Sequence, residues 1–390
     1  MSSAPLSIDA LCADLDIPDF VRGFEHIPGR KVVFGPGALA IIGVEAAELG
    51  GRSVLVVTDP GIARTGAVEA ARRFLSEAGL LVTIFDEVHE NPTTEDVDRC
   101  VRAAREAEAD VLVGLGGGSS MDTAKGCNFI LTNGGRMRDY WGVGKAEKPM
   151  LPLIAAPTTS GTGSECQSFA LIADAETHAK MACGDPKAAA AVSILDPELT
   201  LTMPAAVTAH TGIDAIAHAV ETAVCRKRSD VSFAYSRAAW NLLDRGMEDV
   251  TRDPADRVAR ARMQLGAAFA GTAIENSMLG VAHSCANPLT AHYGIVHGQA
   301  VGTMLPHVVE FNGRDSEVAE IYELLAGPGL SDRIREHLRR TGMDLSLADL
   351  GVDRDRLGEL AEEAEGQWTA QFNPVGVNAD SLRALYEAAW

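Results

Sequence analysis

The sequence predicts an α/β domain with a mostly parallel sheet, followed by an all-helical domain. Three observations support this fold class. Short β-branched runs alternate with amphipathic stretches between about residues 50 and 200, strand signals then end near Met203-Pro204, and alanine-rich segments of helical period continue to the last residue. A proline can open a helix at its first turn. We therefore predict an α/β domain over residues 1–203 and an all-helical domain over residues 204–390.

Five short runs rich in aliphatic and β-branched residues are the expected strands: Ser53–Thr58, Leu81–Phe85, Val111–Leu115, Leu151–Ala156 and Ala191–Leu195. Stretches between them, such as Ala63–Ala78 and Thr94–Ala107, carry apolar residues at helical spacing and charged outer faces. Strands that alternate with helices in this way indicate βα units and parallel pairing. In the helical half, the charge runs Arg252–Arg262 and Arg333–Arg340 are expected to be solvated helix faces.

Bulk composition restricts the possible partners. The formal charge of −20 argues against nucleic acid and anionic membranes, because both bind through concentrated lysine and arginine. Seven cysteines without a Cys-x-x-Cys pair indicate reduced thiols. The N-terminal residues lack a signal-peptide pattern, and no apolar run reaches membrane-spanning length. We expect a cytoplasmic protein of two domains.

The segment Val111–Lys125 predicts a phosphate site. A buried strand runs into three glycines and two serines and then into a helix, so free backbone N–H groups meet at a helix N-terminus that no side chain blocks. A tight turn would need glycine for positive φ alone, but three glycines followed by two serines exceed that need. A diphosphate is the expected ligand.

Two further segments fit the same ligand. Asp59 ends the first expected strand and is placed to accept hydrogen bonds from an adenosine ribose, which favours NAD over NADP because a carboxylate repels a 2′-phosphate. The alternative for Asp59 is a helix cap before Pro60-Gly61. The polar segment Pro157–Glu165 follows another strand and offers hydroxyl and backbone donors, although Thr162 and Glu165 also fit a capping box.

The helical half contains a predicted metal centre. Asp214 and His218 are four residues apart in an expected helix and so lie on one face, and His283 and His297 follow further along. Three imidazoles and one carboxylate suit Fe(II) or Zn(II), and suit Mg(II) or Ca(II) poorly. The alternative for a histidine on an apolar helix is a structural role.

With these segments in order, the chain resembles the iron-containing (group III) alcohol dehydrogenase family over nearly its whole length. The resemblance rests on Phe34-Gly-Pro-Gly-Ala, Gly116–Lys125, Pro157–Glu165, Gly212–Glu221, Val296-His-Gly and the ending from Asn373-Pro to Trp390. It implies a dehydroquinate synthase-like architecture, with cofactor and metal in a cleft between the domains, and a homodimer or larger homo-oligomer. The implied metal ligands are Asp214, His218, His283 and His297. The implied cofactor contacts are Asp59, Asn91, Gly117, Gly118, Ser119, Ser120, Asp122, Thr158, Thr159, Thr162 and Lys180.

The predicted function is a metal-dependent, NAD(P)-linked alcohol dehydrogenase or aldehyde reductase. Hydride would pass between the nicotinamide C4 and a small alcohol or aldehyde bound to Fe(II) or Zn(II), with one carboxylate against the dication leaving a net positive site. A dehydroquinate synthase-like lyase or a glycerol phosphate dehydrogenase relative is the second reading, but the segments around His283 and His297 offer few basic residues for its phosphate or acidic substrates. A non-catalytic nucleotide-binding assembly protein is the third reading.

Several residues near the predicted site in sequence either depart from the family pattern or are not expected to bind metal. Asn287 occupies a position where the family usually has a second histidine, and an asparagine cannot act as a general base at neutral pH. Either the ribose hydroxyls of the cofactor and water pass the proton, or the choice of substrate has shifted. Gln167 stands where relatives in the family often carry a smaller hydroxyl residue. Cys285 is expected to be a buried, inert thiol, and His292 and His307 are expected to be packed or surface residues.

Overall fold

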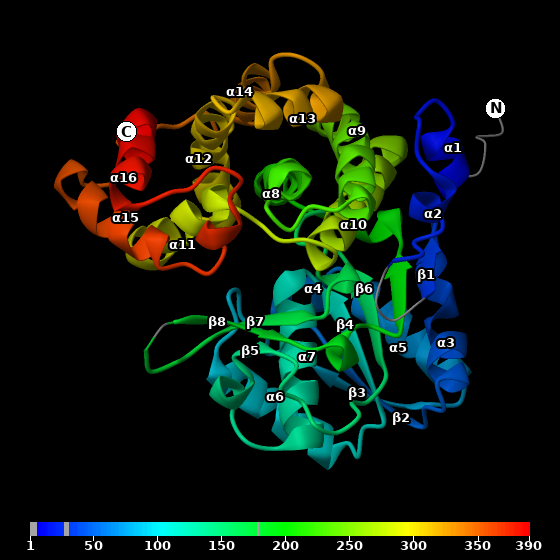
Figure 1. The fold of residues 1–390 in the computed structure, drawn as a ribbon. Helices are drawn as coiled ribbons and strands as arrows, with labels where there is room; N and C mark the ends of the chain where they lie inside the picture. Colours follow the sequence, from blue (N-terminus) through cyan, green and yellow to red (C-terminus); the bar gives the residue numbers. More distant parts are fainter. Residues whose placement is uncertain (1–5, 27–30, 178) are drawn as a thin grey trace. The chain divides into compact units, whose positions relative to one another are not determined.

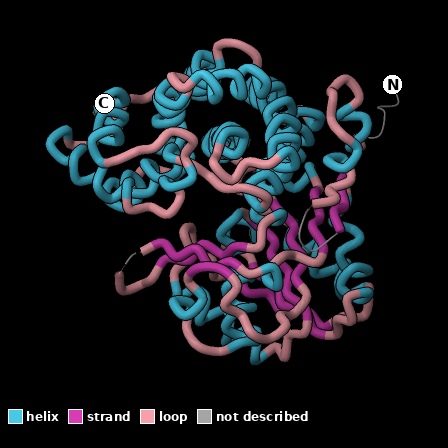
Figure 2. Tube along the Cα trace, viewed as in Figure 1, coloured by secondary structure: helices cyan, strands magenta, loops and turns pink. Residues whose placement is uncertain are grey.

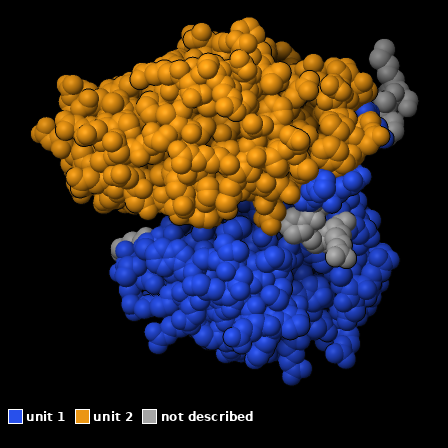
Figure 3. All heavy atoms as spheres, viewed as in Figure 1, with its two compact units in different colours: residues 1–11, 23–159, 163–202 blue, residues 12–22, 160–162, 203–390 orange. Residues whose placement is uncertain are grey.

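The computed structural model describes residues 6–26, 31–177 and 179–390. The chain divides into two compact units (Figure 3): a sheet unit of residues 1–11, 23–159 and 163–202, and a helical unit of residues 12–22, 160–162 and 203–390. Two short segments, 12–22 and 160–162, thus group with the helical unit although they precede Pro204. The two-domain division at Met203-Pro204 stays a prediction.

The sheet unit contains a six-stranded sheet in the order β1-β9-β6-β4-β2-β3 (Figure 1). All of its strand pairs are parallel, which confirms the predicted mostly parallel sheet. A smaller sheet, β5-β8-β7, contains an antiparallel pair. The strands are β1 (Lys31–Phe34), β2 (Ser53–Val57), β3 (Leu81–Phe85), β4 (Val111–Gly116), β5 (Gly142–Val143), β6 (Leu153–Pro157), β7 (Phe169–Ala173), β8 (Lys180–Gly184) and β9 (Val192–Leu195).

Helices cover both faces of the larger sheet. Val54 and Val56 of β2 pack with residues of α3 and α5 on one face, while Leu55 and Val57 pack with α6 and α7 on the other. Because both faces are covered, residues 54–57 of β2 are apolar in succession rather than alternating with polar residues. The helices of this unit are α1 (Ile8–Cys12), α3 (Ile42–Glu48), α4 (Pro60–Ala63), α5 (Ala67–Glu77), α6 (Thr94–Glu106) and α7 (Gly118–Asn133).

Two features of the sheet unit differ from the prediction. The helix expected over Ala63–Ala78 is interrupted, because Gly66 has a φ of 86° and separates α4 from α5. Four strands, β1, β5, β7 and β8, were not predicted. The pairing of β7 with β8 brings the ring of Phe169 against Gly184, where a Cβ would collide with it, and this contact is not visible in local sequence.

The helical unit surrounds one central helix, α8 (Ala205–Val224), which contacts α9, α10, α12, α13 and α14 (Figure 1). No strand follows β9 in the described part of the chain, in agreement with the predicted all-helical region (Figure 2). The remaining helices are α2 (Asp19–Arg22), α9 (Asp230–Arg252), α10 (Arg257–Glu275), α11 (Val281–Tyr293), α12 (His297–Asn312), α13 (Ser316–Ala326), α14 (Leu330–Thr341), α15 (Leu357–Glu365) and α16 (Ala379–Ala389).

The helix α8 packs closely against α9 and α10. A Cβ at Gly212 would lie 2.7 Å from Met247 Sδ of α9 and 2.8 Å from Met263 Cε of α10, so a larger residue would require these methionine side chains to shift. Arg260 of α10 corrects the expectation that Arg252–Arg262 is a solvated face. Its side chain is buried and donates hydrogen bonds to Thr208 Oγ1 of α8 and to the Pro254 carbonyl, each at 2.9 Å. None of the described helices is long and apolar enough to cross a membrane.

Candidate metal centre and nucleotide site

The helix α8 presents Asp214, His218 and Glu221 on one face, since these residues are separated by one and two helical turns. All three side chains are buried. His283 lies in the first turn of α11, and His297 is the first residue of α12. Three helices of the helical unit therefore supply the predicted ligands.

The four predicted metal ligands lie together around one carboxylate oxygen. The Nε2 atoms of His283, His218 and His297 lie 3.3, 3.6 and 3.8 Å from Asp214 Oδ1. The rings of His218 and His283 are stacked with centroids 4.9 Å apart, and those of His283 and His297 are 5.5 Å apart. The ligand atoms of Asp214, His283 and His297 all lie within 4.8 Å of one another, as a shared cation requires.

The polar atoms of this cluster fit a divalent cation. Asp214 Oδ1 and His283 Nε2 are buried, and neither has a hydrogen-bond partner within the residues described. A buried polar atom without a partner costs about 1–3 kcal/mol. A cation between them would satisfy both, and three nitrogens with one oxygen are a donor set that Fe(II) and Zn(II) accept.

The electrostatics of the cluster agree with this fit. Burial alone would raise the pKa of Asp214, but His218, His283 and His297 outweigh it and hold that pKa well below its usual range. Burial lowers the pKa of His218, which favours the neutral imidazole that can bind a cation. Burial also opposes the charged form of His283, but Glu221 and Asp214 raise its pKa to about 9. A cation that binds His283 at neutral pH therefore displaces a proton.

Glu221 lies beside the cluster and was not among the predicted site residues. Its Oε2 accepts a hydrogen bond of 2.5 Å from His283 Nδ1, on the far side of the ring from Asp214. The sequence analysis predicted a net positive site from one carboxylate and one dication. That charge balance omitted Glu221, a second buried carboxylate beside the centre. A spacing of seven residues from Asp214 was the available signal, because it places Glu221 on the same helical face.

The glycine turn after β4 has the features of a phosphate site. Gly117 caps α7 without a side chain, so the first N–H groups of that helix are left open at Gly118 and Ser119. Three buried hydroxyl groups near the carboxyl ends of β2, β4 and β6 have no hydrogen-bond partner among the described residues, namely Thr58 Oγ1, Ser120 Oγ and Thr158 Oγ1. A Cβ at Gly116 would collide with Ser120 Oγ. This cradle therefore needs glycine and offers unused polar atoms to a ligand.

Thr158 and Thr159 lie beside the glycine turn within the sheet unit. The Thr158 N–H donates to the Gly116 carbonyl at 2.9 Å, and a Cβ at Gly117 would lie 3.4 Å from Thr159 Cγ2. Thr162 belongs to the segment 160–162 of the helical unit, where Gly161 packs on Thr211 of α8. The alternative capping box of Thr162 with Glu165 is wrong, because the short 3-10 helix η3 (Ser164–Cys166) begins after Gly163 without a side-chain cap.

Asp59 caps a helix with one carboxylate oxygen, which is one of the two roles that the sequence left open. Its Oδ1 accepts hydrogen bonds from the N–H groups of Gly61 and Ile62, at 2.8 and 3.0 Å, and so caps α4. Its Oδ2 lies 3.4 Å from the position that a Cβ on Gly116 would occupy. One oxygen therefore serves the helix, and the other faces the glycine turn.

Three cofactor contacts inferred from resemblance fall in one region of the sheet unit. Ala173 of β7 pairs with Lys180 of β8, and the Ala173 N–H donates to the Pro92 carbonyl at 2.9 Å, which places the adjoining Asn91 near this strand pair. Asn91 has a positive φ of 54°. Burial raises the pKa of Asp122, and the charge of Lys180 is one of the influences that oppose it, so these two side chains are also neighbours.

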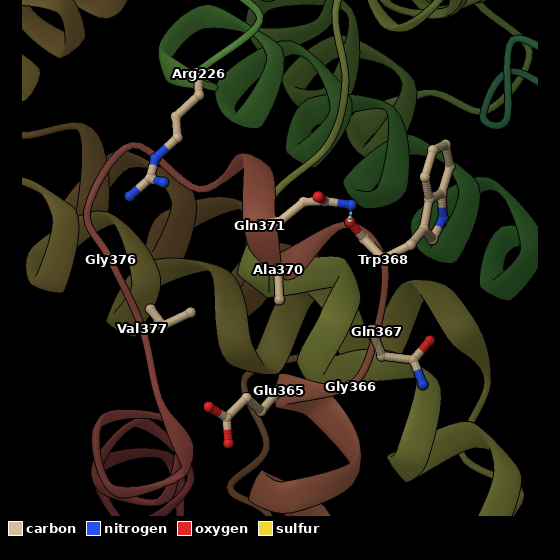
Figure 4. Close-up of a pocket in the computed structure, with 9 residues that line it drawn as sticks. All are labelled: Arg226, Glu365, Gly366, Gln367, Trp368, Ala370, Gln371, Gly376 and Val377. Carbon is tan, nitrogen blue, oxygen red and sulfur yellow. Dashed lines mark hydrogen bonds between the residues drawn. The ribbon is translucent and has the colours of Figure 1, made fainter.

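Asn287 lies one turn after His283 on α11, and its Nδ2 donates to Gln367 Oε1 at 3.0 Å. Gln367 also lines a pocket of about 420 Å³ in the helical unit (Figure 4). The other lining residues are Arg226, Glu365, Gly366, Trp368, Ala370, Gln371, Gly376 and Val377. None of the predicted site residues lines this pocket, so it is distinct from the four predicted metal ligands. Asn287 connects the two regions, because it lies one helical turn after His283 and bonds to Gln367 of the pocket wall.

The other residues set apart by sequence are placed as follows. Cys285 is buried, and burial raises the pKa of its thiol to about 12, which suits an inert thiol. His292 is paired with Glu363 on α15 at 2.8 Å. Burial lowers the pKa of His307, which lies on α12 ten residues after the predicted ligand His297. Gln167 follows η3 and is partly buried.

The chain is similar to known proteins over nearly all of its length. Residues 29–197 match the profile of iron-containing alcohol dehydrogenases, and residues 208–390 match the C-terminal profile of the Fe-containing alcohol dehydrogenase family. Alcohol dehydrogenase 4 of Schizosaccharomyces pombe is 33% identical over 93% of this chain and 88% of its own length. The NAD-dependent methanol dehydrogenase of Bacillus methanolicus is 34% identical over 93% of this chain and 98% of its own. The crystal structure of a 1,3-propanediol oxidoreductase matches with a TM-score of 0.88 at 32% identity, covering 93% of this chain and 98% of that one.

Proposed function

From its membership of the iron-containing alcohol dehydrogenase family, to which this chain belongs, we propose that the protein transfers hydride between NAD and a small alcohol or aldehyde. The family makes it an oxidoreductase, and a metal-dependent alcohol dehydrogenase is its general class. The observation that carries the proposal is the cluster of three imidazole nitrogens around Asp214 Oδ1, at 3.3 to 3.8 Å.

The helical unit supplies the metal ligands in this proposal. Asp214, His218, His283 and His297 would hold Fe(II), with Zn(II) as the alternative that the same donor set accepts. The bound cation would supply Lewis acidity, which polarises a substrate oxygen. Asp214, His218 and His283 are buried, which excludes water from these three donors and keeps each in one orientation, while His297 is partly exposed.

The sheet unit would bind the dinucleotide. The open N–H groups at the start of α7 and the hydroxyl groups of Ser120 and Thr158 would hold its diphosphate. Asp59 Oδ2 would accept hydrogen bonds from the adenosine ribose, and its charge would repel a 2′-phosphate. This arrangement supports NAD in preference to NADP. The name of the Bacillus methanolicus relative, which specifies NAD, also supports this choice.

Proton transfer in this protein would bypass position 287. Asn287 cannot take up a proton at neutral pH, and its amide is held by Gln367. A proton from the substrate hydroxyl would therefore leave through the ribose hydroxyls of the cofactor and water. Assembly as a homodimer or larger homo-oligomer and a cytoplasmic location stay predictions from the sequence.

A substrate panel tests the proposal. The iron-reconstituted protein is assayed with NADH and with NADPH against short aldehydes, hydroxyaldehydes and aldehydes that carry an acidic group, and in reverse with alcohols, diols and glycerol phosphate. We expect turnover of small neutral substrates, with a higher kcat/KM for NADH. Turnover confined to glycerol phosphate would favour the second reading, and metal binding without any turnover would favour a non-catalytic protein.

A further inference from the structure

Glu221 connects two helices that carry ligands of the candidate metal centre. It lies on α8, three residues after His218, and its carboxylate reaches the first turn of α11. Oε2 accepts a hydrogen bond from His283 Nδ1 at 2.5 Å, and Oε1 accepts one from the Ala282 N–H at 2.6 Å. One carboxylate thus holds both the ring of His283 and the backbone that carries it.

The start of α11 is built to receive this carboxylate. Gly280 is the N-cap of the helix and offers no side chain to its open N–H groups. A Cβ at Gly280 would lie 3.1 Å from Glu221 Oε1, so a larger residue would crowd the carboxylate. Glu221 therefore takes the place of an N-cap side chain from another helix, and its negative charge is favourable at a helix N-terminus.

This hydrogen bond also selects the tautomer of His283. An ionised carboxylate only accepts hydrogen bonds, so the proton of the neutral imidazole is assigned to Nδ1 and the lone pair to Nε2. Nε2 is the atom that lies 3.3 Å from Asp214 Oδ1, buried and without a hydrogen-bond partner within the described ranges. The assigned tautomer is the one in which His283 can bind a cation on that side.

The charge of Glu221 acts in the same direction. The residue is 4% exposed, and no lysine or arginine forms an ion pair with it in the part of the chain that the structure describes. Together with Asp214, it places two buried carboxylates at the centre, whose charges one dication would balance.

We propose that Glu221 is the positioning residue that makes His283 a metal ligand and retains the cation. This inference rests on the proposed function, because it presupposes that the four ligands bind a metal. Groups that hydrogen-bond to a ligating histidine typically change metal affinity by ~10- to 100-fold when they are replaced.

Glu221→Gln tests the proposal because the amide keeps the size of the side chain. If its oxygen still accepts from the Ala282 N–H, its NH2 group faces His283 Nδ1 and favours the tautomer with the proton on Nε2, where a cation cannot bind. Asp244→Asn is the matched control. It removes a carboxylate that bonds to His337 Nε2 at 2.8 Å in the same unit, away from the four ligands.

The measurement is the dissociation constant for Zn(II), obtained by competition with a chromophoric chelator on metal-free protein, together with the visible spectrum of the Co(II)-loaded forms. We expect Glu221→Gln to bind Zn(II) ~10- to 100-fold more weakly than the unchanged protein and to show an altered Co(II) spectrum, with Asp244→Asn unchanged in both. Equal affinity and an unaltered spectrum in Glu221→Gln would overturn the proposal. Failure of the unchanged protein to bind Zn(II) or Co(II) at all would instead refute the proposed function.

A second variant covers the case in which Glu221→Gln cannot be purified. Glu221→Asp keeps the charge, but its shorter side chain cannot reach Ala282 and His283 together. Weaker Zn(II) binding than in Asp244→Asn would support the proposal, and equal binding would overturn it.

Discussion

Glu165 is expected to make the stability of the sheet unit depend on pH, and Glu165→Gln should remove that dependence. The residue is 3% exposed, and its Oε2 has no hydrogen-bond partner among the described residues. Burial raises the pKa of this carboxyl from 4.5 to about 7, and its own backbone and Lys125 oppose the shift only in part. The folded protein therefore keeps the proton at pH values where the unfolded chain has released it.

The sign and size of the effect follow from this difference. Below pH 4.5 both states hold the proton, and the contribution to stability is complete; as the pH rises towards 7, only the unfolded state releases it, so the free energy of unfolding falls. A pKa difference of this size corresponds to about 3 kcal/mol. Glutamine is neutral at every pH, so Glu165→Gln removes this contribution to the pH dependence of the free energy of unfolding.

The assay compares the two proteins at pH 5 and pH 8. Because two compact units can unfold separately, hydrogen exchange of peptides from β4 and α7 is followed together with urea unfolding. We expect the unchanged protein to lose about 2.5 kcal/mol more than Glu165→Gln between these pH values, because part of the loss has already occurred at pH 5. Parallel pH dependence of the two proteins would refute the reasoning, since all other titrating groups are shared.

Three substitutions test the nucleotide site and its surroundings. Gly116→Ala should weaken NADH binding at least about tenfold in a fluorescence titration, because the new Cβ collides with Ser120 Oγ. The control is Gly358→Ala, whose Cβ lies in open space on α15 and which should bind NADH normally. Equal NADH affinities of the two variants would contradict the phosphate site. Asp59→Ala should cost about 1 kcal/mol of stability through the lost cap of α4 and should lower the preference for NADH over NADPH in kcat/KM; an unchanged preference would remove Asp59 from the ribose site. Asn287→His should add an ionisation with a pKa of about 6.5 to the pH profile of kcat/KM. A pH profile without this added ionisation would place position 287 away from the reacting atoms.

Local sequence was sufficient where one element carries the pattern. The β-branched runs predicted β2, β3 and β4 within a residue of their observed bounds. In β2 and β4 the runs are buried and mostly apolar because helices cover both faces of the sheet. In β3, an edge strand that is partly exposed, the β-branched residues themselves were the signal. Asp214 and His218 share a helical face through spacing alone, so half of the candidate metal centre followed from periodicity. His283 and His297 could be added only from residue type and family resemblance.

Features made by tertiary packing were not accessible in the same way. The contacts of Glu221 are made with the start of α11, whose N-cap is Gly280. No local sequence pattern connects that helix start to α8. Arg260 looks like part of a solvated charge run, yet α8 and the Pro254 carbonyl take up its donors in the interior. The β8 strand, Lys-Met-Ala-Cys-Gly, has no β-branched or aromatic residue, so its pairing with β7 and not its own composition makes it a strand.

The most direct test of the central claim is the metal content of the purified protein and of His283→Ala, measured by mass spectrometry alongside NADH binding and turnover. We predict about one Fe(II) or Zn(II) per chain in the unchanged protein, and loss of both metal and turnover in His283→Ala while NADH binding persists. Full turnover of a metal-free His283→Ala protein would contradict the account.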